Sequence, residues 1–195
     1  VYTCAGDRSN IHEWLRGERN FDLWVTYYAD DGNRHRDLAD FYNKRHGKKF
    51  PNLFEVFRRF LHIFEQYEAI FVADDDLIID GPSISKLFEI RKQHDLWILQ
   101  PAYDPRGIVS HPITQVDERY FMRYTNFVEV TCPLFRTDKL RQFFEVYDPE
   151  IVGWGVDWWF LEELGPDLAN KVAVVDSVPC INPDPRSKGR ELEVE

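Results

Sequence analysis

The sequence predicts a single α/β domain in which helices flank a mostly parallel central sheet. Strand-like apolar runs alternate with helix-like runs along the chain, which is the pattern of layered α/β proteins. The 195 residues are 44% hydrophobic and 15% aromatic, enough for one substantial core. The chain shows no internal repeat and no linker. We therefore expect residues 1–182 to form one domain and residues 183–195, which are charged and contain prolines, to form a tail.

The first third of the chain predicts two strands and three helical segments. We expect a strand at residues 1–5, a short helix that begins after Asn10, and a second strand within residues 21–32 that ends in acidic residues. Residues 33–50 are polar and basic, which predicts a loop with one short helix. Residues 52–67 are the clearest helix, because large apolar side chains recur every three or four residues and so share one face.

The rest of the chain continues the alternation of strands and helices. Residues 103–125 are irregular in pattern. The other expected elements, in chain order, are a strand at 69–73, a turn and then a helix within 81–95, strands at 95–102 and 126–135, a helix at 137–148, a glycine-flanked turn that enters a helix within 153–165, and a strand at 171–178. Several apolar strands joined by helices favour parallel pairing, because a parallel connection needs a long crossover.

The composition limits which classes of partner and which cellular compartment we expect. The net charge of −10 disfavours a nucleic-acid partner, because such proteins normally present a basic face. No apolar run approaches the ~20 residues of a membrane span. The three cysteines are too few and too far apart for a disulfide framework or a zinc finger, which favours a reducing compartment. We expect a cytoplasmic bacterial protein, or a Golgi-lumen fragment without its anchor if the source is eukaryotic.

Three adjacent aspartates follow the strand expected at residues 69–73. In open α/β sheets, ligands bind beyond the carboxyl ends of the strands, and this strand delivers Asp74, Asp75 and Asp76 to that edge. Carboxylate oxygens are hard ligands that suit Mg²⁺ or Mn²⁺, and a divalent ion would relieve their mutual repulsion. The alternative interpretation is a solvated acidic turn that caps the next helix.

A second group of candidate residues lies in the stretch GWGVDWWF, residues 153–160. Its glycines, of which Gly155 precedes the expected helix, allow a ligand to approach the backbone closely. Trp154 is suited to stack on the apolar face of a sugar. Asp157 stands near a helix N-terminus among tryptophans, where a carboxylate can accept a proton. The alternative is that the tryptophans are core residues and Asp157 is a helix cap.

In their order and spacing, these motifs resemble GT-A-fold glycosyltransferases. The closer resemblance is to a plant and bacterial family, proposed to be glycosyltransferases and long described as a domain of unknown function. It covers roughly residues 20–182 and is carried by FDLWVTYYADDG, YEAIFVADDDL, LQPAYD, FVEVTCPLF and VGWGVDWWF. The resemblance implies a GT-A-like domain whose nucleotide-binding half is Rossmann-like.

The resemblance also implies roles for individual residues. Asp74 and Asp76 match the first and last positions of the family's DxD motif, which bind the donor nucleotide and the metal, with Asp75 between them. Asp157 matches the acidic residue proposed as the base for inverting transfer. The remaining implied contacts, with the acceptor or the transferred sugar, are Glu129, Gln100, Asp104, Trp154 and Gly155. On position alone, Asp7 and Asp30 at strand ends are candidate nucleotide contacts.

The implied activity belongs to carbohydrate biosynthesis. A sugar would pass from a nucleotide sugar, most commonly UDP-linked, to a hydroxyl of a glycan or another acceptor, with Mn²⁺ or Mg²⁺ as cofactor and inversion at the anomeric carbon. Lys49 would assist the phosphates, unless it is an ordinary surface charge. His111 lies in a loop and could touch a ligand, although a lone loop histidine is more often structural or merely exposed.

Two other functions stay open at the level of sequence. A metal-dependent phosphotransferase or phosphatase would use Asp74 as nucleophile and Asp76 as acid, although Ile78 stands where that class normally has Thr or Val. A degenerate carbohydrate-binding module would keep the fold without turnover. Asn182 favours the degenerate module, because it occupies a position where the family that this sequence resembles tends to have a His.

Overall fold

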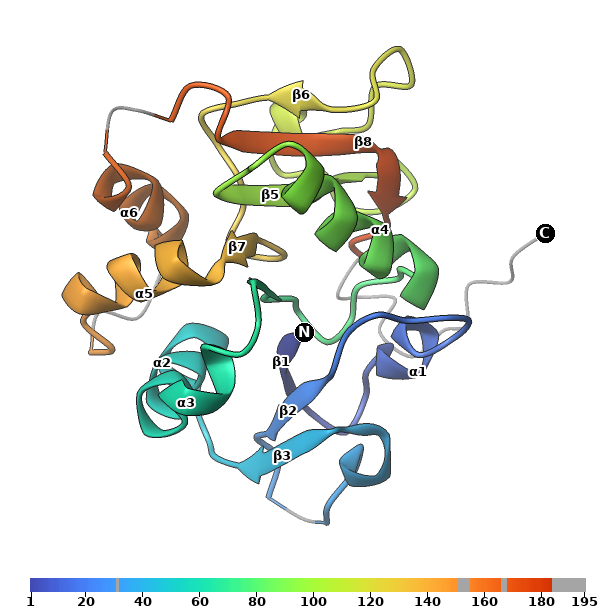
Figure 1. The fold of residues 1–195 in the computed structure, drawn as a ribbon. Coiled ribbons are helices and arrows are strands. Elements are labelled where there is room, and N and C mark those ends of the chain that lie inside the picture. The colour runs from blue at the N-terminus through green and yellow to red at the C-terminus, as the bar shows by residue number, and fades with distance from the viewer. Residues whose placement is uncertain (31, 151–154, 166–167, 184–195) are drawn as a thin grey trace.

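A computed structural model describes residues 1–30, 32–150, 155–165 and 168–183. The predicted tail, apart from Pro183, lies outside these residues. Eight strands and the helices that connect them form the described part of the chain (Figure 1). No helix in this part is long and apolar enough to cross a membrane.

The strands form two sheets that meet side by side. The first has the order β1-β2-β3, with β1 at Tyr2–Ala5, β2 at Trp24–Tyr27 and β3 at Phe41–Lys44, all parallel. The second has the order β4-β7-β5-β8-β6, with β4 at Ala69–Phe71, β7 at Leu134–Arg136, β5 at Ile98–Tyr103, β8 at Val172–Cys180 and β6 at Arg123–Tyr124. A parallel bridge between Tyr2 and Val72 joins them, and Ala73 N donates to Tyr2 O at 3.0 Å.

Most of the strands run in one direction. β7 is antiparallel to both of its neighbours, β4 and β5, so those two strands are parallel to each other. β8 is parallel to β5, and β6 is antiparallel to β8. The mostly parallel sheet is therefore confirmed. As a consequence, β1, β2 and β4 all end at one edge, which is where ligands bind in such sheets.

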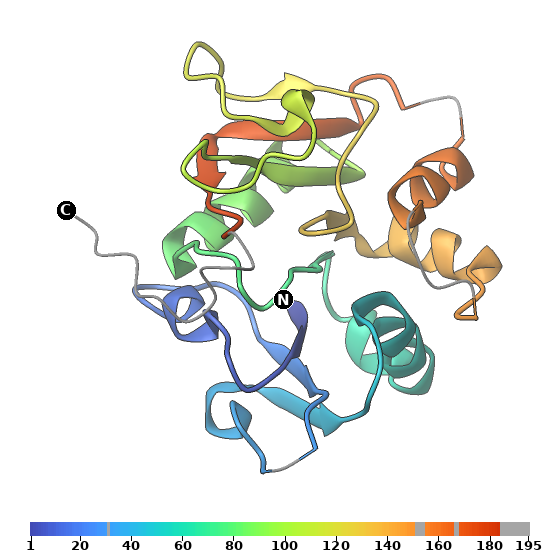
Figure 2. The ribbon, with the colours of Figure 1, turned by 180° about the vertical axis from the view of Figure 1, so that it is seen from behind.

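Helices cover both faces of the combined sheet. Helices α2 (Lys49–Arg59), α3 (Leu61–Phe64), α5 (Thr137–Val146) and α6 (Val156–Glu163) lie on one side, and α1 (Ile11–Trp14) and α4 (Gly81–Gln93) on the other (Figures 1 and 2). Alternate residues of β4 explain this: Ile70 packs into the first layer, whereas Ala69 and Phe71 pack into the second. This arrangement confirms the predicted α/β layering.

The layer on the α2 side is built largely from aromatic rings. The ring of Phe143 in α5 lies 6.4 Å from that of Phe50 in α2 and 5.9 Å from that of Phe160 in α6. Burying one such side chain stabilises the fold by ~1.5–3 kcal/mol. These contacts hold α2, α5 and α6 together, and α2 and α6 each begin beside a candidate site residue: Lys49 opens α2 and Asp157 lies in the first turn of α6.

The structure corrects three sequence predictions. The helix predicted at 52–67 begins earlier, at Lys49, and is interrupted at Phe60, whose backbone angles (φ −123°, ψ 35°) are not helical. The segment 33–50 contains the predicted short helix, at Arg36–Leu38, but also β3. The strand predicted at 126–135 is regular only in β7. Residues 127–133 instead cross towards β4, where Asp74 N donates to Thr131 O at 3.0 Å and Val72 N to Pro133 O at 2.8 Å.

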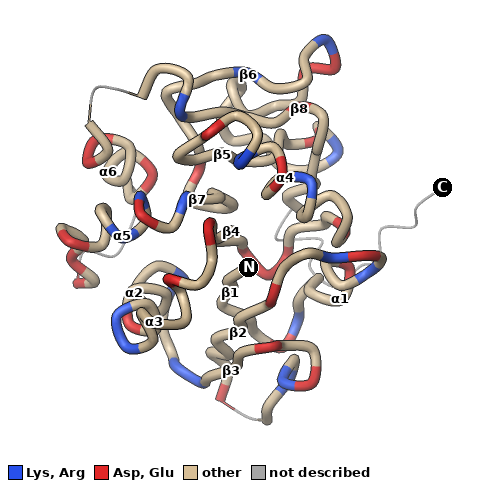
Figure 3. The backbone as a smooth tube through the Cα atoms, in the orientation of Figure 1, with Lys and Arg blue, Asp and Glu red and all other residues tan. Residues whose placement is uncertain are grey.

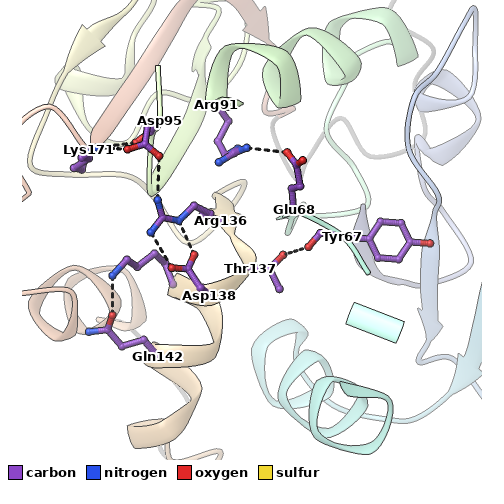
Figure 4. Close-up of polar contacts among 10 residues, drawn as sticks. Tyr67, Glu68, Arg91, Asp95, Arg136, Thr137, Asp138, Gln142 and Lys171 are labelled. Carbon is purple, nitrogen blue, oxygen red and sulfur yellow. Dashed lines mark hydrogen bonds and ion pairs between the residues drawn. The ribbon is translucent and has the colours of Figure 1, made fainter. Parts of the chain in front are cut away.

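Ion pairs join the elements at the opposite, amino end of β4. Arg136 bonds to Asp138 at 2.6 Å and to Asp95 at 3.0 Å, and Asp95 also pairs with Lys171 at 2.5 Å (Figure 4). Thr137, which opens α5, donates from Oγ1 to the Tyr67 carbonyl at 2.6 Å. These contacts fix β7 and α5 against the ends of α4 and β4, at the edge of the sheet opposite the three aspartates.

Candidate active site

The loop with the three aspartates is bound to the loop that follows β1. The Gly6 amide donates to Asp75 Oδ2 at 3.1 Å, and the Asn10 amide donates to the Asp75 carbonyl at 2.6 Å. Asn10 Nδ2 also donates to the Asp76 carbonyl at 2.5 Å. Asn10 does precede α1, as predicted, but its side chain makes no capping bond and holds the aspartate loop instead. The ends of β1 and β4 thus form one unit.

Lys49 partly neutralises the three aspartates. Its Nζ lies 2.6 Å from Asp74 Oδ1 and donates to the carbonyls of Val130 at 2.8 Å and Thr131 at 2.7 Å. A lysine ammonium has three protons, so these three acceptors use all of them. The Lys49 side chain is only 11% exposed, whereas that of Asp74 is 44% exposed. Lys49 is therefore a built part of the site and not a surface charge.

The two aspartates at the ends of β1 and β2 lie in different surroundings. Asp7 Oδ1 accepts a hydrogen bond from Tyr27 OH at 2.5 Å, and this bond raises the pKa of Tyr27 to about 12. Arg34 Nε lies 3.4 Å from the same oxygen. Because Asp7 follows Gly6, it belongs to the unit formed with Asp75. Asp30 is highly exposed, and its described ionic contact is with His46 at 3.4 Å, so no contact among the described residues joins it to the aspartate loop.

Gln100 and Glu129 come together beneath the surface. Gln100 is fully buried in β5, and its Oε1 accepts a hydrogen bond from the Glu129 amide at 2.6 Å. Glu129 is only 4% exposed. Its Oε1 lies 3.0 Å from His111 Nδ1 and 3.1 Å from Thr114 Oγ1. Any contact of Glu129 with an acceptor is therefore indirect, through His111.

Asp104 lies at the end of β5, outside this cluster. Arg106 Nε and Nη2 bind its two carboxylate oxygens at 3.0 and 2.8 Å, and these bonds lower the pKa of Asp104. The Asp104 amide donates to the Cys180 carbonyl at 2.9 Å. The carboxylate is thus occupied by a neighbouring arginine, and no described contact joins it to Glu129 or Gln100.

Helix α6 starts as predicted, but only part of its motif is described. Gly155 has φ 107°, which favours glycine, and directly precedes the helix. Asp157 lies in the first turn, and its Oδ1 accepts a hydrogen bond from the Trp158 amide at 3.1 Å. Trp158 is 59% exposed, and its ring lies 5.0 Å from that of Phe127. Trp154 lies outside the described residues.

The segment 127–131 connects candidate residues that are far apart in the sequence. Phe127 contacts Trp158 beside Asp157, Glu129 binds His111, and the carbonyls of the next two residues bind Lys49 beside Asp74. Sequence reasoning assigned no role to Phe127 and treated His111 and Lys49 as weak candidates. No spacing rule could have found them, because 18 residues separate His111 from Glu129 and 81 separate Lys49 from Val130.

The carboxylates of Asp74 and Asp76 could hold a divalent ion only with help from a substrate. No group of three or more His, Cys, Asp or Glu suited to a metal occurs among the described residues. Mg²⁺ is commonly bound by one or two carboxylates, with substrate phosphates and water completing its shell. Two hard oxygen donors at an exposed sheet edge fit that mode of binding. They do not fit a metal held by the protein alone.

A cavity of about 410 Å³ lies elsewhere, at the amino end of β4. Its lining includes Arg91, Arg136 and Arg141, which would suit an anion. Each of these arginines is already paired with a carboxylate: Arg91 with Glu68 and Arg136 with Asp138, as Figure 4 shows, and Arg141 with Glu65. Acidic and basic residues are similarly interspersed along much of the chain (Figure 3). This cavity therefore offers a diphosphate no uncompensated positive charge.

Residues 54–126 match the sequence model of a family described as "Protein of unknown function (DUF707)". No curated protein matches the sequence. Among solved structures, S. aureus TarS 1-349 matches with a TM-score of 0.58 at 10% identity, covering 90% of this chain and 57% of that one. The same fragment in complex with UDP-GlcNAc matches with a TM-score of 0.60 at 11% identity (94% and 58% covered), and in complex with UDP with a TM-score of 0.55 at 11% identity (94% and 60%).

These comparisons confirm the resemblance to a family of unknown function over residues 54–126 and confirm the α/β fold class. At 10–11% identity the likeness to TarS concerns the fold alone. This chain spans less than two thirds of each of these TarS chains.

Proposed function

We propose that the protein is a glycosyltransferase that moves a sugar from a nucleotide-sugar donor, most simply a UDP-sugar, to an acceptor hydroxyl. The observation that carries this proposal is the hydrogen-bonded unit of the β1 and β4 loops, with Asp7, Asp74, Asp75 and Asp76 at the carboxyl edge of the sheet. A fold shared with TarS, whose structure was solved with UDP-GlcNAc, supports a nucleotide sugar as the ligand of this edge.

The donor would bind across the two loops. In this proposal Asp7 and Asp74 reach the nucleoside, because both project from strand ends and retain exposed carboxylates. Asp75 is buried, and the Gly6 amide donates to its Oδ2, so in this proposal Asp75 shapes the loop and does not contact the donor. Asp30 would contact the donor only at the rim.

Asp76, with Asp74, would hold a Mn²⁺ or Mg²⁺ ion. Such an ion, when bound, neutralises the negative charge that develops on the departing nucleoside diphosphate. Lys49 compensates the charge of Asp74 from the protein side and holds that carboxylate against the segment 130–131. The ion would therefore need Asp76 and the donor in addition to Asp74.

Asp157 would accept the proton of the acceptor hydroxyl. The acceptor oxygen then forms a bond to the anomeric carbon from the face opposite the nucleotide, the bond from that carbon to the diphosphate oxygen breaks, and configuration is inverted. Asp157 lies in the first turn of α6, where its Oδ1 accepts a hydrogen bond from the Trp158 amide. Gly155, and Trp154 outside the described residues, would border the transferred sugar.

Calorimetric titration of UDP and of GDP, with and without Mn²⁺, tests the donor site. We expect Mn²⁺-dependent binding of one nucleotide that is lost in Asp76→Asn and retained in Glu89→Gln, an exposed carboxylate on α4. No binding of either nucleotide would contradict a uridine or guanosine donor. Release of inorganic phosphate from p-nitrophenyl phosphate, lost in Asp74→Asn, would instead indicate a phosphotransferase.

A further inference from the structure

Glu129 is a buried carboxylate whose one ionic partner among the described residues is a histidine. Its side chain is 6% exposed and that of His111 is 46% exposed. A buried carboxylate requires hydrogen-bond donors, because loss of its hydration is costly. Thr114 Oγ1 is a shared donor, since the same hydroxyl also lies 2.8 Å from the His111 carbonyl. The His111 Nδ1 contact, at 3.0 Å, is therefore the dedicated one.

This contact determines which nitrogen of His111 faces outward. An ionised carboxylate only accepts hydrogen bonds, so Nδ1 must carry the proton. In the neutral ring Nε2 is then an acceptor, and the side chain that carries it is 46% exposed. Glu129 thus positions His111 to receive a hydrogen bond from a hydroxyl outside the protein.

Aromatic side chains adjoin the exposed side of this pair. The ring of Phe127 lies 4.6 Å from His111 and 5.0 Å from Trp158. Trp158 is the most exposed large hydrophobic side chain among the described residues. An exposed indole and a hydrogen-bond acceptor that both adjoin the Phe127 ring offer the two features that bind a sugar, whose C–H face is apolar and whose rim carries hydroxyls.

The position of the pair relates it to the candidate active site. Glu129 is followed by Val130 and Thr131, whose carbonyls bind the Lys49 ammonium that contacts Asp74. Trp158 is adjacent to Asp157 in the first turn of α6. Short chains of contacts therefore link the pair to Asp74 and to Asp157, the carboxylates that the proposed function assigns to the donor and the acceptor.

We propose that His111 and Trp158 form a saccharide-binding subsite, positioned by Glu129, and that the acceptor of the reaction is therefore a carbohydrate. Trp158 stacks on the sugar ring, and His111 Nε2 accepts a hydrogen bond from one of its hydroxyls. The proposal that this subsite binds a saccharide rests on these contacts alone. Only its assignment as the acceptor subsite rests on the proposed function.

The binding test uses a panel of immobilised neutral oligosaccharides, probed with the full chain in the presence and absence of UDP. We expect at least one saccharide to be bound, and binding to fall at least tenfold in both His111→Asn and Trp158→Ala. Two control variants, His62→Ala on α3 and Tyr124→Ala on β6, remove exposed rings elsewhere and should leave binding within twofold. Binding of no saccharide, or binding unchanged in either of the first two variants, overturns the proposal.

A matched pair of substitutions separates the two nitrogens of His111. Asn at this position can still donate to Glu129, since its Nδ2 takes the place of Nδ1, but it has no atom at Nε2. Gln reaches the Nε2 position with an amide oxygen that can accept a hydrogen bond. We expect His111→Gln to retain measurable binding and His111→Asn to lose it. Equal loss in both variants overturns the role of Nε2.

The orientation of the ring can be measured without any ligand. Long-range ¹H–¹⁵N spectra of histidine-labelled protein report which ring nitrogen is protonated. We expect the Nδ1–H form for His111 in the wild type and the Nε2–H form in Glu129→Leu, with circular dichroism checking the fold. An Nε2–H ring in the wild type overturns the proposal. If nucleotides fail to bind while saccharide binding depends on His111, the donor site is wrong and this subsite stands.

Discussion

At the scale of single residues, Lys49 explains part of how the protein stabilises three consecutive aspartates. Its ammonium contacts Asp74 and the carbonyls of Val130 and Thr131. Sequence reasoning placed Asp74 and Asp76 at a sheet edge and expected a metal ion to relieve their repulsion. The structure adds a lysine from a distant helix, which provides part of that relief from within the protein.

Replacement of Lys49 by methionine should destabilise the protein by about 2 kcal/mol, because the partly buried Val130 carbonyl loses its donor, the Thr131 carbonyl keeps only the Asp74 amide, and Asp74 loses its cation. Asp74 is partly exposed, so its share of the loss is small. Urea unfolding of Lys49→Met measures the effect. Lys48→Met, the exposed neighbouring residue, is the control and should change the free energy of unfolding by less than ~0.5 kcal/mol.

Asp157→Asn should separate binding from chemistry. The amide is isosteric but cannot accept the acceptor proton, so we expect unchanged nucleotide affinity and transfer slowed by roughly 10²–10⁴-fold. The measurement combines UDP calorimetry with a UDP-release assay on a UDP-sugar. Normal turnover would remove Asp157 from the role of base and leave it as a helix-end residue that bonds the Trp158 amide.

Metal binding should require the nucleotide. Because the described residues offer only Asp74 and Asp76, and Lys49 already compensates one of them, Mn²⁺ alone should bind weakly. Calorimetry with Mn²⁺ and no nucleotide should show a Kd in the millimolar range or weaker, and UDP should tighten it. Tight Mn²⁺ binding to the free protein would show that further ligands complete the site.

At the scale of elements, the connection after β8 depends on a close backbone contact. An added Cβ at Gly107 would lie 2.5 Å from the Asn182 carbonyl oxygen and 2.9 Å from its amide nitrogen. The Ile108 amide donates to the same carbonyl at 2.7 Å. Asn182, which replaces the expected family histidine, is thus held by its backbone against the loop after β5.

Gly107→Ala should therefore destabilise the protein by roughly 1–3 kcal/mol, the usual cost of overpacking, because both contacting atoms belong to the backbone. Thermal unfolding measures the loss. Ser110→Ala, an exposed position in the same loop, should leave the unfolding temperature nearly unchanged. An equal temperature for Gly107→Ala and the wild type would mean that the segment at Asn182 moves aside without cost.

Helices were largely predictable at this scale, whereas irregular segments were not. The expected helix at 81–95 corresponds to α4, and that at 137–148 to α5. The strand expected at 126–135 is regular only in β7. An apolar run predicts that its residues are buried, but it does not predict their backbone conformation. Residues 127–131 are buried or half-buried without being a strand, and it is this irregular path that brings Glu129 to His111.

At the scale of the whole molecule, surface ion pairs make stability depend on pH. Hydrogen bonding to Lys171 lowers the pKa of Asp95, and bonding to Arg119 lowers that of Asp117 to about 2. A carboxylate with a folded-state pKa below its unfolded value of ~3.9 contributes stability above that value and loses it as the pH falls towards the folded value. The free energy of unfolding should therefore decrease between about pH 5 and pH 2.

Urea midpoints measured across this range test the prediction. Asp95→Asn should lower the midpoint at pH 7 slightly and make the decrease at acid pH shallower, because its carboxylate no longer gains a proton. Glu89→Gln, whose carboxylate is exposed on α4, should leave the decrease as steep as in the wild type. A midpoint that is constant from pH 5 to pH 2 would contradict the contribution of these pairs.

The sequence by itself determined the layered α/β class, the mostly parallel sheet and the placement of Asp74, Asp75 and Asp76 at a strand end. These depend on local apolar periods and on where an apolar run stops. Only the tertiary structure decided that Lys49 neutralises Asp74 and that Glu129 orients His111. The physical reason is that these contacts join residues distant in the chain, through a segment whose path is set by packing against the sheet and by no period of its own.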